Sequence, residues 1–422
     1  MKNSSSAKKS SEGIYETPPT SSVPQIVPVS RFESVGDEES VSREVSEARG
    51  AHDNGHPLQK RIDMKYLVKA LVKYNASDLH LKPGRPPLYR VNGKIIPAKM
   101  ADLSPDQVQT IIMAMLNARQ VQDLHKKLQI DFSFRVGDLG RFRCNAFYQR
   151  GMLSAVIRLI PMYAKKLEDL GVPSVVREFC MKQRGLVLVT GATGSGKSTT
   201  LAGMVNYIAQ SRPCHILTIE DPIEYMFPDS KGTITQREIG ADTHSFKDGL
   251  LAGLRQDPDV IMVGEMRDAE TIQTVITAAE TGHLVLATMH THDAKGSIDR
   301  ILDVVEASSR NQVRIQISSV LLAVVSQRLL PRADGQGRVT ACEIMVKSPA
   351  IEQLILRNEL EHIPELIASS SNYYKMQTIN QDLVRLVTEG LITEEEAVKA
   401  SSNPDDLKLN LSGVARENYH SN

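Results

Sequence analysis

The loop from Gly191 to Ser198 has the residue types and the spacing that bind phosphate groups. It reads GATGSGKS and matches each fixed position of the pattern G-x-x-x-x-G-K-S/T. The apolar run before it (186–190) is strand-like, and the segment after it (199–209) is compatible with a helix, which is the context that phosphate binding requires. Backbone N–H groups of such a loop point at a phosphate where a helix begins and negative charge is favoured. The loop therefore predicts a nucleotide site.

Individual residues of the loop have distinct expected roles. Lys197 reaches the β- and γ-phosphates, and Ser198 ligates Mg²⁺. The alternative is a Gly/Ser-rich turn that binds nothing, but the complete pattern and both flanks favour phosphate binding. The residues expected to bind the nucleotide are Gly191, Thr193, Gly194, Ser195, Gly196, Lys197, Ser198 and Thr199.

Carboxylates follow two further apolar runs. The run VIMV leads to Glu265 after one glycine, and the run HILTI leads to Glu220 and Asp221. Ligands of open α/β sheets bind at the carboxyl ends of the strands, so these side chains are expected beside the loop. Glu265 is the candidate for the base that orients or deprotonates the attacking water. The alternative is that it only forms an ion pair, with Arg267 or Arg255.

The metal ligands other than Ser198 are less constrained by the sequence. Gly264 occupies the position at which many phosphate-loop ATPases have an Asp that holds Mg²⁺. The metal is therefore expected to be held partly through water, or by Glu220 or Asp221. The competing interpretation of Asp221 and Pro222 is turn chemistry alone, because a proline ends a strand and fixes a turn.

Two histidines bracket the apolar run HLVLATMH, with His283 at its start and His290 at its end. A lone histidine is more often structural, whereas a pair beside a phosphate site is compatible with contacts to the γ-phosphate, and both interpretations stay open. Histidines and cysteines do not cluster with ligand spacing in the sequence, so no transition metal is expected.

Arginines recur on strand-like runs well before the phosphate loop. Arg141 and Arg143 alternate with Phe142 and Cys144, which puts both arginines on one face of a strand. A solvated edge is one interpretation and an RNA-binding sheet is another, although the arginine face lacks stacking aromatics. The third is that this region supplies an arginine to a phosphate site, in its own chain or in a neighbouring one.

Composition and charge narrow the class of protein. Hydrophobic residues make up 41% and charged residues 24%, as in globular proteins. The formal net charge is +0, so no global basic field attracts nucleic acid or acidic lipid. No apolar run has the length of a membrane span, and the N-terminus has no secretory h-region. The four cysteines, without any C-x-x-C pair, are expected to be buried thiols in a reducing cytosol.

The chain divides by composition into five expected segments. A long apolar-poor leader is expected to be disordered, and strands that alternate with helices predict a parallel α/β domain later in the chain. Within that domain, a helical tail is expected from Arg310 through Arg328 and on to about Ala400. The expected segments are a leader at 1–60, an α+β unit at 61–165, a linker at 166–180, the α/β domain at 181–400 and a loose tail at 401–422.

Several segments occur in an order that resembles one family. They are SDLHLKPGRPPLYRVNG, RFRCNAF, GATGSGKST, ILTIEDPIEY, LRQDPDVIMVGEMRD, TGHLVLATMHTHDA and KMQTIN. Together they are similar to the type IV pilus retraction ATPases, the PilT/PilU group of bacterial secretion ATPases. The resemblance covers about residues 62–400 and implies an α/β fold, with a smaller N-terminal α+β PAS-like domain, a RecA-like P-loop ATPase domain and C-terminal helices.

The resemblance also implies a function and partners. It implies a homohexameric motor that hydrolyses ATP with Mg²⁺ to power pilus retraction and twitching motility. The motor would be cytoplasmic and peripherally associated with the inner-membrane pilus machine, with a platform protein and a paralogous pilus ATPase as partners and no nucleic acid. In the family's motifs, Glu220 falls in the Asp box, Glu265 in the atypical Walker B motif, and both histidines in the His box. The catalytic residues implied are Glu265, Glu220, His290, His283, Arg143 and Arg158.

One segment departs from the family's pattern. The C-terminal helix linked with retraction usually reads close to AIRNLIRE, and here it reads AIEQLILR, with Glu352 in place of an arginine. An accessory, nucleotide-dependent partner of another pilus motor therefore stays open as an alternative. A pilus-assembly or type II secretion ATPase is a second alternative, but such proteins generally carry a paired C-x-x-C module that this chain lacks.

Overall fold

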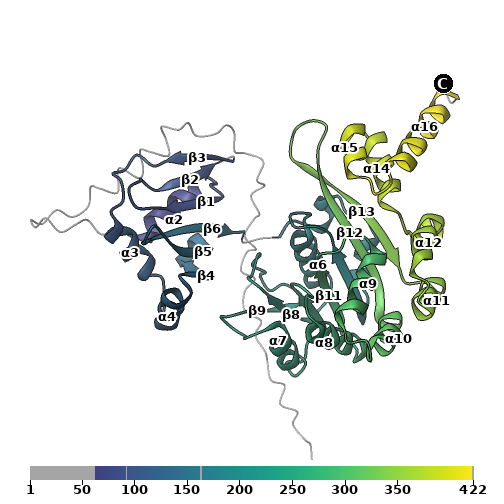
Figure 1. Ribbon diagram of the computed structural model, residues 1–422, viewed down its shortest axis with the longest axis horizontal. Coiled ribbons are helices and arrows are strands. Elements are labelled where there is room, and N and C mark those ends of the chain that lie inside the picture. Colours follow the sequence, from purple (N-terminus) through teal and green to yellow (C-terminus); the bar gives the residue numbers. More distant parts are fainter. Residues whose placement is uncertain (1–61, 92, 162–163, 421–422) are drawn as a thin grey trace, which may run out of the picture.

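The computed structural model describes residues 62–91, 93–161 and 164–420, and the predicted leader lies outside these residues. The described residues form two β-sheets, each with its own helices, which lie side by side in Figure 1. Within the described part of the chain, the helices are too short or too polar to cross a membrane.

The first sheet has six strands in the order β3-β2-β1-β6-β5-β4, and neighbouring strands are antiparallel. Phe142, Cys144 and Ala146 of β5 are buried, which leaves Arg141 and Arg143 together on the other face. The strands are β1 (Asp78–Leu81), β2 (Leu88–Val91), β3 (Lys94–Pro97), β4 (Gln129–Val136), β5 (Gly140–Gln149) and β6 (Met152–Ile160). The helices of this unit are α2 (Met64–Lys73), α3 (Pro105–Met113), α4 (Ala118–Lys127) and the 3-10 turn η1 (Gly137–Leu139).

Two of these helices begin at capping boxes. Ser104 and Gln107 exchange side-chain and backbone hydrogen bonds at the start of α3. Asn117 and Gln120 do the same for α4, which sequence analysis missed although the N-x-x-Q spacing is a capping signal.

The second sheet has seven strands in the order β13-β12-β7-β11-β10-β8-β9. All neighbours pair in parallel except β12 and β13. Leu186 and Leu188 of β7 belong to the core formed with the helices between residues 246 and 369, whereas Val187 and Val189 belong to the core formed with the helices between residues 175 and 211. The strands are β7 (Gly185–Thr190), β8 (His215–Glu220), β9 (Thr233–Glu238), β10 (Val260–Val263), β11 (Leu284–Met289), β12 (Leu321–Pro331) and β13 (Arg338–Val346).

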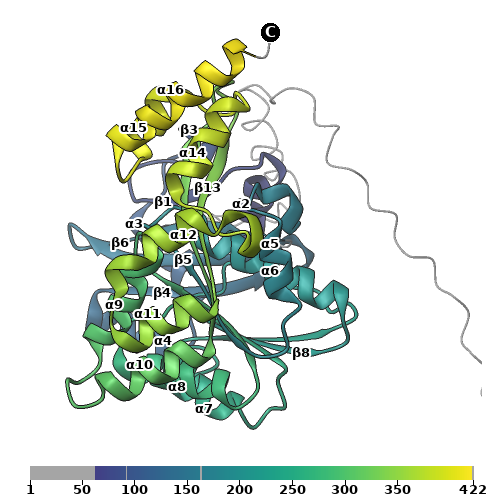
Figure 2. The ribbon, with the colours of Figure 1, turned by 90° about the vertical axis from the view of Figure 1, so that its right-hand side faces the viewer.

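Helices cover both faces of this sheet, and the last three gather at one end of it (Figure 2). There, Leu383 and Leu407 pack with Leu330 and Ala341 of the β12–β13 hairpin. The helices are η2 (Leu167–Leu170), α5 (Val175–Cys180), α6 (Lys197–Ser211), α7 (Phe246–Gly253), α8 (Ala269–Glu280), α9 (Ala294–Val304), α10 (Arg310–Val320), α11 (Pro349–Arg357), η3 (Leu360–His362), α12 (Ile363–Ser369), α13 (Ser371–Tyr374), α14 (Ile379–Thr388), α15 (Glu394–Ala400) and α16 (Pro404–His420).

The predicted helical tail is wrong from Leu321 to Val346, because α10 ends at Val320 and the chain continues as the hairpin of β12 and β13. An apolar run buried on both faces has no periodicity that distinguishes strand from helix, and pairing with β7 decides the outcome here. The segment expected to be a linker instead carries η2 and α5, whose Val176 and Phe179 are buried against the second sheet. The expected loose tail forms α16, with Leu407 fully buried. The boundaries of the five segments, as the sequence analysis gives them, stay predictions.

A buried carboxylate joins the two sheets. Glu238, at the end of β9, accepts a hydrogen bond from Arg141 Nη2 on β5 at 2.9 Å and another from Ser133 Oγ on β4. Because Glu238 is only 5% exposed, this ion pair is shielded from solvent on the carboxylate side. The contact holds the first sheet close to the carboxyl ends of the parallel strands.

Candidate nucleotide-binding site

A cavity of about 700 Å³ lies where β7, β8, β10 and β11 end, within the size range of small-molecule sites. Strands of a parallel sheet bring their carboxyl ends to one edge, so loops far apart in sequence meet here. The predicted residues that line the cavity are Thr193, Gly194, Gly196, Lys197, Ser198, Thr199, Glu220, Asp221, Glu265, His290 and Arg158.

The phosphate loop connects β7 to α6, and a neighbouring strand supports it. Gly191 has a φ of +143°, and a Cβ at this position would collide with the Gln327 carbonyl oxygen and with Ser195 Oγ. Gln327, on β12, also donates from Nε2 to the Ser195 carbonyl oxygen at 2.7 Å. Gly191 and Ser195 therefore shape the loop without lining the cavity.

Lys197 begins α6 and is almost fully buried. Its ammonium donates to the carbonyl oxygens of Gly191 at 2.8 Å and Ala192 at 3.0 Å, and lies 3.3 Å from His290 Nδ1. Burial lowers the pKa of Lys197, an effect that the charge of Glu265 partly opposes. The loop carbonyls thus hold the charge at the mouth of the loop, where phosphate oxygens would be stronger acceptors.

Glu265 accepts from Arg267 Nε at 2.6 Å and lies 3.0 Å from His290 Nε2. Burial raises the pKa of Glu265, but the contacts with Arg267 and His290 outweigh burial and leave the pKa below its ordinary value. Glu265 is therefore ionised at neutral pH, as a base must be. The ion pair considered as an alternative is present, yet the Arg267 side chain is 72% exposed, so the pair does not lock the carboxylate away from the cavity.

Glu220 has the opposite electrostatic environment. It is buried at the end of β8, where Thr218 Oγ1 donates to it at 2.6 Å and Gln236 Nε2 at 3.1 Å. Burial raises the pKa of Glu220 to about 7, and these hydrogen bonds only partly counter the increase. Two carboxylates with pKa values shifted in opposite directions therefore share the cavity, an arrangement typical of acid–base sites.

The donor set fits a magnesium ion held mainly by a nucleotide. Among the described residues, no group of three or more His, Cys, Asp and Glu side chains could hold a metal ion by itself. Mg²⁺ in nucleotide sites is usually bound through one or two protein ligands together with phosphates and water. Ser198 and Asp221 both line the cavity and could supply such ligands.

The first sheet contributes Arg158, on β6, to the cavity. Its Nε donates to Asp78 Oδ1 at 2.8 Å, and Asp78 is buried on β1. Within the described residues, the two terminal nitrogens of Arg158 have no acceptor, and the side chain is 66% exposed. One edge of the guanidinium is thus anchored while the fork that binds phosphate oxygens stays available.

Besides Gly191 and Ser195, two of the predicted catalytic residues do not reach the cavity. Arg143 lies opposite Arg158 in the β5–β6 register, but it contacts Asp131 at 3.5 Å and is not part of the lining. His283 precedes β11, and its Nδ1 lies 2.9 Å from the Ala278 carbonyl oxygen. The expectation that His283 contacts the γ-phosphate is wrong for the cavity of this chain. His283 precedes β11 and His290 follows it, and the two ends of one strand lie at opposite edges of the sheet.

Sequence reasoning did not single out several residues that line the cavity. Tyr225 Oη lies 2.8 Å from Thr199 Oγ1, and its motif, ILTIEDPIEY, was a signal that could have revealed it. Arg338 begins β13, a strand that was not predicted, so no local signal pointed to it. The residues missed include Glu224, Tyr225, Phe246, Arg267 and Arg338.

The fold and the site define a class of protein. A phosphate loop between β7 and α6, carboxylates after β8 and β10, and helices on both faces of the sheet are the features of a RecA-like P-loop ATPase. The predicted α/β fold class is confirmed by solved relatives of this architecture.

Comparison with known proteins then gives the family. The model of the family described as "Type II/IV secretion system protein" matches residues 51–399. A protein of Pseudomonas aeruginosa named "Type IV pilus retractation ATPase PilT" is 44% identical over 346 residues, which are 82% of this chain and 100% of that protein. Another protein of the same organism, named "Type IV pilus ATPase PilU", is 38% identical over 348 residues, covering 82% of this chain and 91% of that protein.

Among solved structures, "Crystal Structure of the Pilus Retraction Motor PilT and Bound ADP" superposes with a TM-score of 0.77 at 46% identity, covering 82% of this chain and 99% of that chain. The Legionella pneumophila ATPase DotB superposes with a TM-score of 0.72 at 27% identity, covering 85% of this chain and 98% of that chain. The chain belongs to the type II/IV secretion system protein family, and it is an ATPase of that family.

Proposed function

We propose that this chain is an ATP-driven motor that retracts type IV pili and thereby supports twitching motility. The observation that carries the proposal is a single cavity that joins Lys197, the Glu265–His290 pair and Arg158 of the first sheet. Support comes from a relative named as a retraction ATPase, which is 44% identical and matched over its full length. The bound ADP named for a solved relative supports a nucleotide in this cavity.

Residues that line the cavity have different roles in the proposed hydrolysis of ATP. Lys197 exchanges the carbonyls of Gly191 and Ala192 for phosphate oxygens, and Ser198 with Asp221 would hold Mg²⁺, which neutralises phosphate charge when bound. Glu265 orients and deprotonates the attacking water. His290 Nδ1 faces the Lys197 ammonium and acts as an acceptor, so His290 Nε2, 3.0 Å from Glu265, donates a hydrogen bond that orients the carboxylate.

The motor is proposed to work as a homohexameric ring. Arg158 reaches the cavity from a separate sheet, so the angle between the sheets controls how well the site is completed. Head-to-tail contacts that close into a ring would restrict this angle in every subunit. The ring would be cytoplasmic and would lie against the inner-membrane platform protein of the pilus machine.

Deletion of the gene in the parent bacterium tests the proposal. Excess pili that do not retract are expected, and the wild-type gene should restore retraction whereas a Lys197→Ala copy should not. Loss of pili on deletion would contradict retraction and would favour an assembly role.

A second candidate is an accessory partner of another pilus motor. Glu352 in the first turn of α11 lies 3.6 Å from Lys347 and replaces the arginine of the usual retraction helix, and the relative named PilU matches over 82% of the chain. Steady-state ATP turnover by the isolated protein separates the two, because an accessory partner needs little turnover of its own.

A further inference from the structure

Gln327 lies beneath the phosphate loop, where the pairing of β12 with β7 ends. The two strands pair in parallel as far as Ser326 and Thr190, whose hydroxyl groups lie 2.9 Å apart. Gln327 follows directly and is therefore level with the first residue of the loop, Gly191. Its side chain is only 2% exposed and does not line the nucleotide cavity, so it does not touch a nucleotide bound there. A polar side chain at such a buried position needs a physical reason.

The backbone and the side chain of Gln327 contact two different parts of the loop. Its carbonyl oxygen approaches Gly191 so closely that a Cβ there would collide with it. Its Nε2 donates to the Ser195 carbonyl oxygen at 2.7 Å, and a Cβ on Gly196 would lie 3.1 Å from the same nitrogen. The side-chain amide is therefore packed against the peptide bond between Ser195 and Gly196.

This hydrogen bond fixes the direction of the Gly196 N–H group. In a planar trans peptide, the carbonyl oxygen and the following N–H point in opposite directions. Since the Ser195 carbonyl points at Gln327, the Gly196 N–H points away from β12. Gly196 lines the nucleotide cavity and directly precedes α6, and its N–H has no acceptor among the described residues. An unpaired N–H group at this place in a phosphate loop is a donor for a phosphate oxygen.

The bond to Ser195 is the interaction that explains why the Gln327 amide is buried. Within the described part of the chain, Gln327 Oε1 is buried without a hydrogen-bond partner, and so is Ser195 Oγ. Unsatisfied buried polar atoms destabilise the folded chain, and proteins retain such costs mainly at functional sites. The structure thus keeps an unsatisfied oxygen together with the nitrogen that holds the loop.

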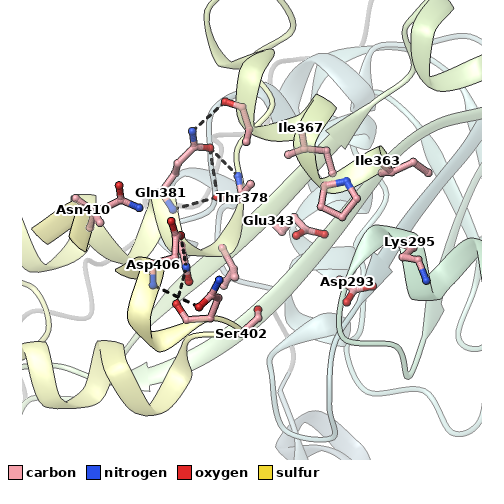
Figure 3. A pocket seen from close by; sticks show the side chains of 16 residues that line it. Asp293, Lys295, Glu343, Ile363, Ile367, Thr378, Gln381, Ser402, Asp406 and Asn410 are labelled. Carbon is pink, nitrogen blue, oxygen red and sulfur yellow. Dashed lines mark hydrogen bonds between the residues drawn. The ribbon is translucent and has the colours of Figure 1, made fainter. Parts of the chain in front are cut away.

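The next residue of β12 contacts a different part of the molecule. Arg328 donates to the Ala400 carbonyl oxygen and, at 3.2 Å, to Ser402 Oγ. Figure 3 shows Ser402 among the C-terminal helices, where it lines a separate cavity together with Glu343 of β13. Contact with the Ser195 carbonyl is therefore particular to Gln327 and is not shared along the strand.

We propose that Gln327 is a positioning residue for nucleotide binding, whose amide holds the peptide between Ser195 and Gly196 so that the Gly196 N–H faces a phosphate oxygen. The inference rests on the proposed ATPase function, because it assigns a role within the same site. Without the amide, the Ser195 carbonyl loses its partner and the peptide is free to rotate. The Gly196 N–H then no longer faces the phosphate.

Gln327→Met tests the proposal, because methionine has nearly the same length and volume but no hydrogen-bond donor. Titration calorimetry measures the binding of ADP and of inorganic pyrophosphate to the full chain. We expect both to bind about tenfold more weakly or worse, and by the same factor, because hydrogen bonds to charged groups are the stronger ones. Pyrophosphate carries only the groups that the loop contacts. Weaker ADP binding with unchanged pyrophosphate binding would therefore overturn the proposal, as would unchanged binding of both.

Steady-state hydrolysis of ATP gives a readout that a merely structural role would not change. The contact with phosphate is present in bound ATP as well as in the transition state, so its loss should raise KM about tenfold and leave kcat within about threefold. A fall in kcat at unchanged KM would overturn the proposal, because it indicates an interaction made only in the transition state. Lower thermal stability with unchanged KM and unchanged ADP affinity would also overturn it.

Thr340→Val is the matched control on the same hairpin. Thr340 is buried on β13, its Oγ1 donates to the Leu170 carbonyl oxygen at 3.0 Å, and it does not line the nucleotide cavity. Valine keeps the shape and removes this one buried hydrogen bond, so ADP and pyrophosphate affinities should stay within about twofold. Losses as large as those of Gln327→Met would show a general loosening of the hairpin and would overturn the proposal.

Gln327→Asn is the second variant, which keeps the fold testable if methionine is not accommodated. Asparagine retains a polar amide but is one methylene shorter, which takes the donor out of hydrogen-bond range of Ser195. The same joint loss of ADP and pyrophosphate affinity is expected, and full affinity would overturn the proposal. Failure of the unaltered chain to bind ADP would instead refute the nucleotide site itself, whereas equal binding by the unaltered and altered chains refutes only the role of Gln327.

Discussion

Replacement of Glu265 by glutamine separates the chemical step from nucleotide binding. In the unaltered chain, Arg267 Nε lies 2.6 Å from the Glu265 carboxylate. Glutamine keeps the size of the side chain and an oxygen that can accept from Arg267 Nε, but it removes the negative charge and the basic site. If Glu265 is the base, turnover should fall about 100-fold or more, which corresponds to about 2.7 kcal/mol of activation free energy.

The fold should tolerate this change. The Arg267 side chain is 72% exposed, and ion pairs with exposed partners contribute at most about 1 kcal/mol to the free energy of unfolding. ADP affinity should stay close to that of the wild type, because Lys197 is positioned by the carbonyls of Gly191 and Ala192.

The assay is phosphate release at saturating ATP, combined with ADP binding by calorimetry. Glu270→Gln on α8 is the control, because it removes a nearby carboxylate that is 68% exposed and that contacts Lys247 outside the cavity. Normal turnover by Glu265→Gln would refute the reasoning and move the base to Glu220. Loss of ADP binding would show instead that Glu265 is needed to build the site.

Three further expectations concern other residues. Lys197→Ala should reduce turnover to less than about a tenth with an unchanged circular dichroism spectrum, since rate losses on removing one phosphate-stabilising group are about 100-fold; retained turnover would contradict the loop assignment. Arg158→Ala should reduce turnover far more than Arg143→Ala, because only Arg158 lines the cavity. If the arginine acts across subunits, mixing Arg158→Ala protein with Lys197→Ala protein should restore part of the activity. A mixture that stays inactive places the action of the arginine within one chain. Burial holds the folded-state pKa of Glu343 at about 7, above its ordinary 4.5, so its stabilising contribution is present below pH 4.5 and is lost as the pH rises through 7. Relative to Glu343→Gln, the unaltered chain should lose about 3 kcal/mol of unfolding free energy over that range, as denaturant titrations at several pH values would measure, and parallel pH profiles would contradict the shift.

Local patterns were sufficient wherever neighbouring residues determine the structure. The run before Gly191 is apolar and β-branched, and the loop after it needs glycine for its backbone, so strand, loop and helix were all predictable from a short window. The helix over Ala269–Glu280 was predictable for the same reason, since its apolar period and its ends lie within one segment.

Local patterns failed where a distant segment decides the structure. The run from Leu321 onward is compatible with a helix or a strand, and it becomes β12 because it pairs with β7 and with β13. Because this run was expected to be a helix, the sequence did not indicate that Gln327 of β12 supports the phosphate loop.

The sequence by itself determined which chemistry the chain can perform. The loop around Lys197 and the carboxylates after two apolar runs specify nucleotide binding and hydrolysis, because residue types and spacing within each motif set their reactivity. Only the tertiary structure decided which residues act together. Arg158 enters the cavity while Arg143 does not, although both lie on one face of the first sheet. His290 contacts Glu265 while His283 lies at the far end of the same strand. These differences arise from strand direction, register and the ion pair between Arg141 and Glu238, all of which depend on contacts between segments far apart in the chain.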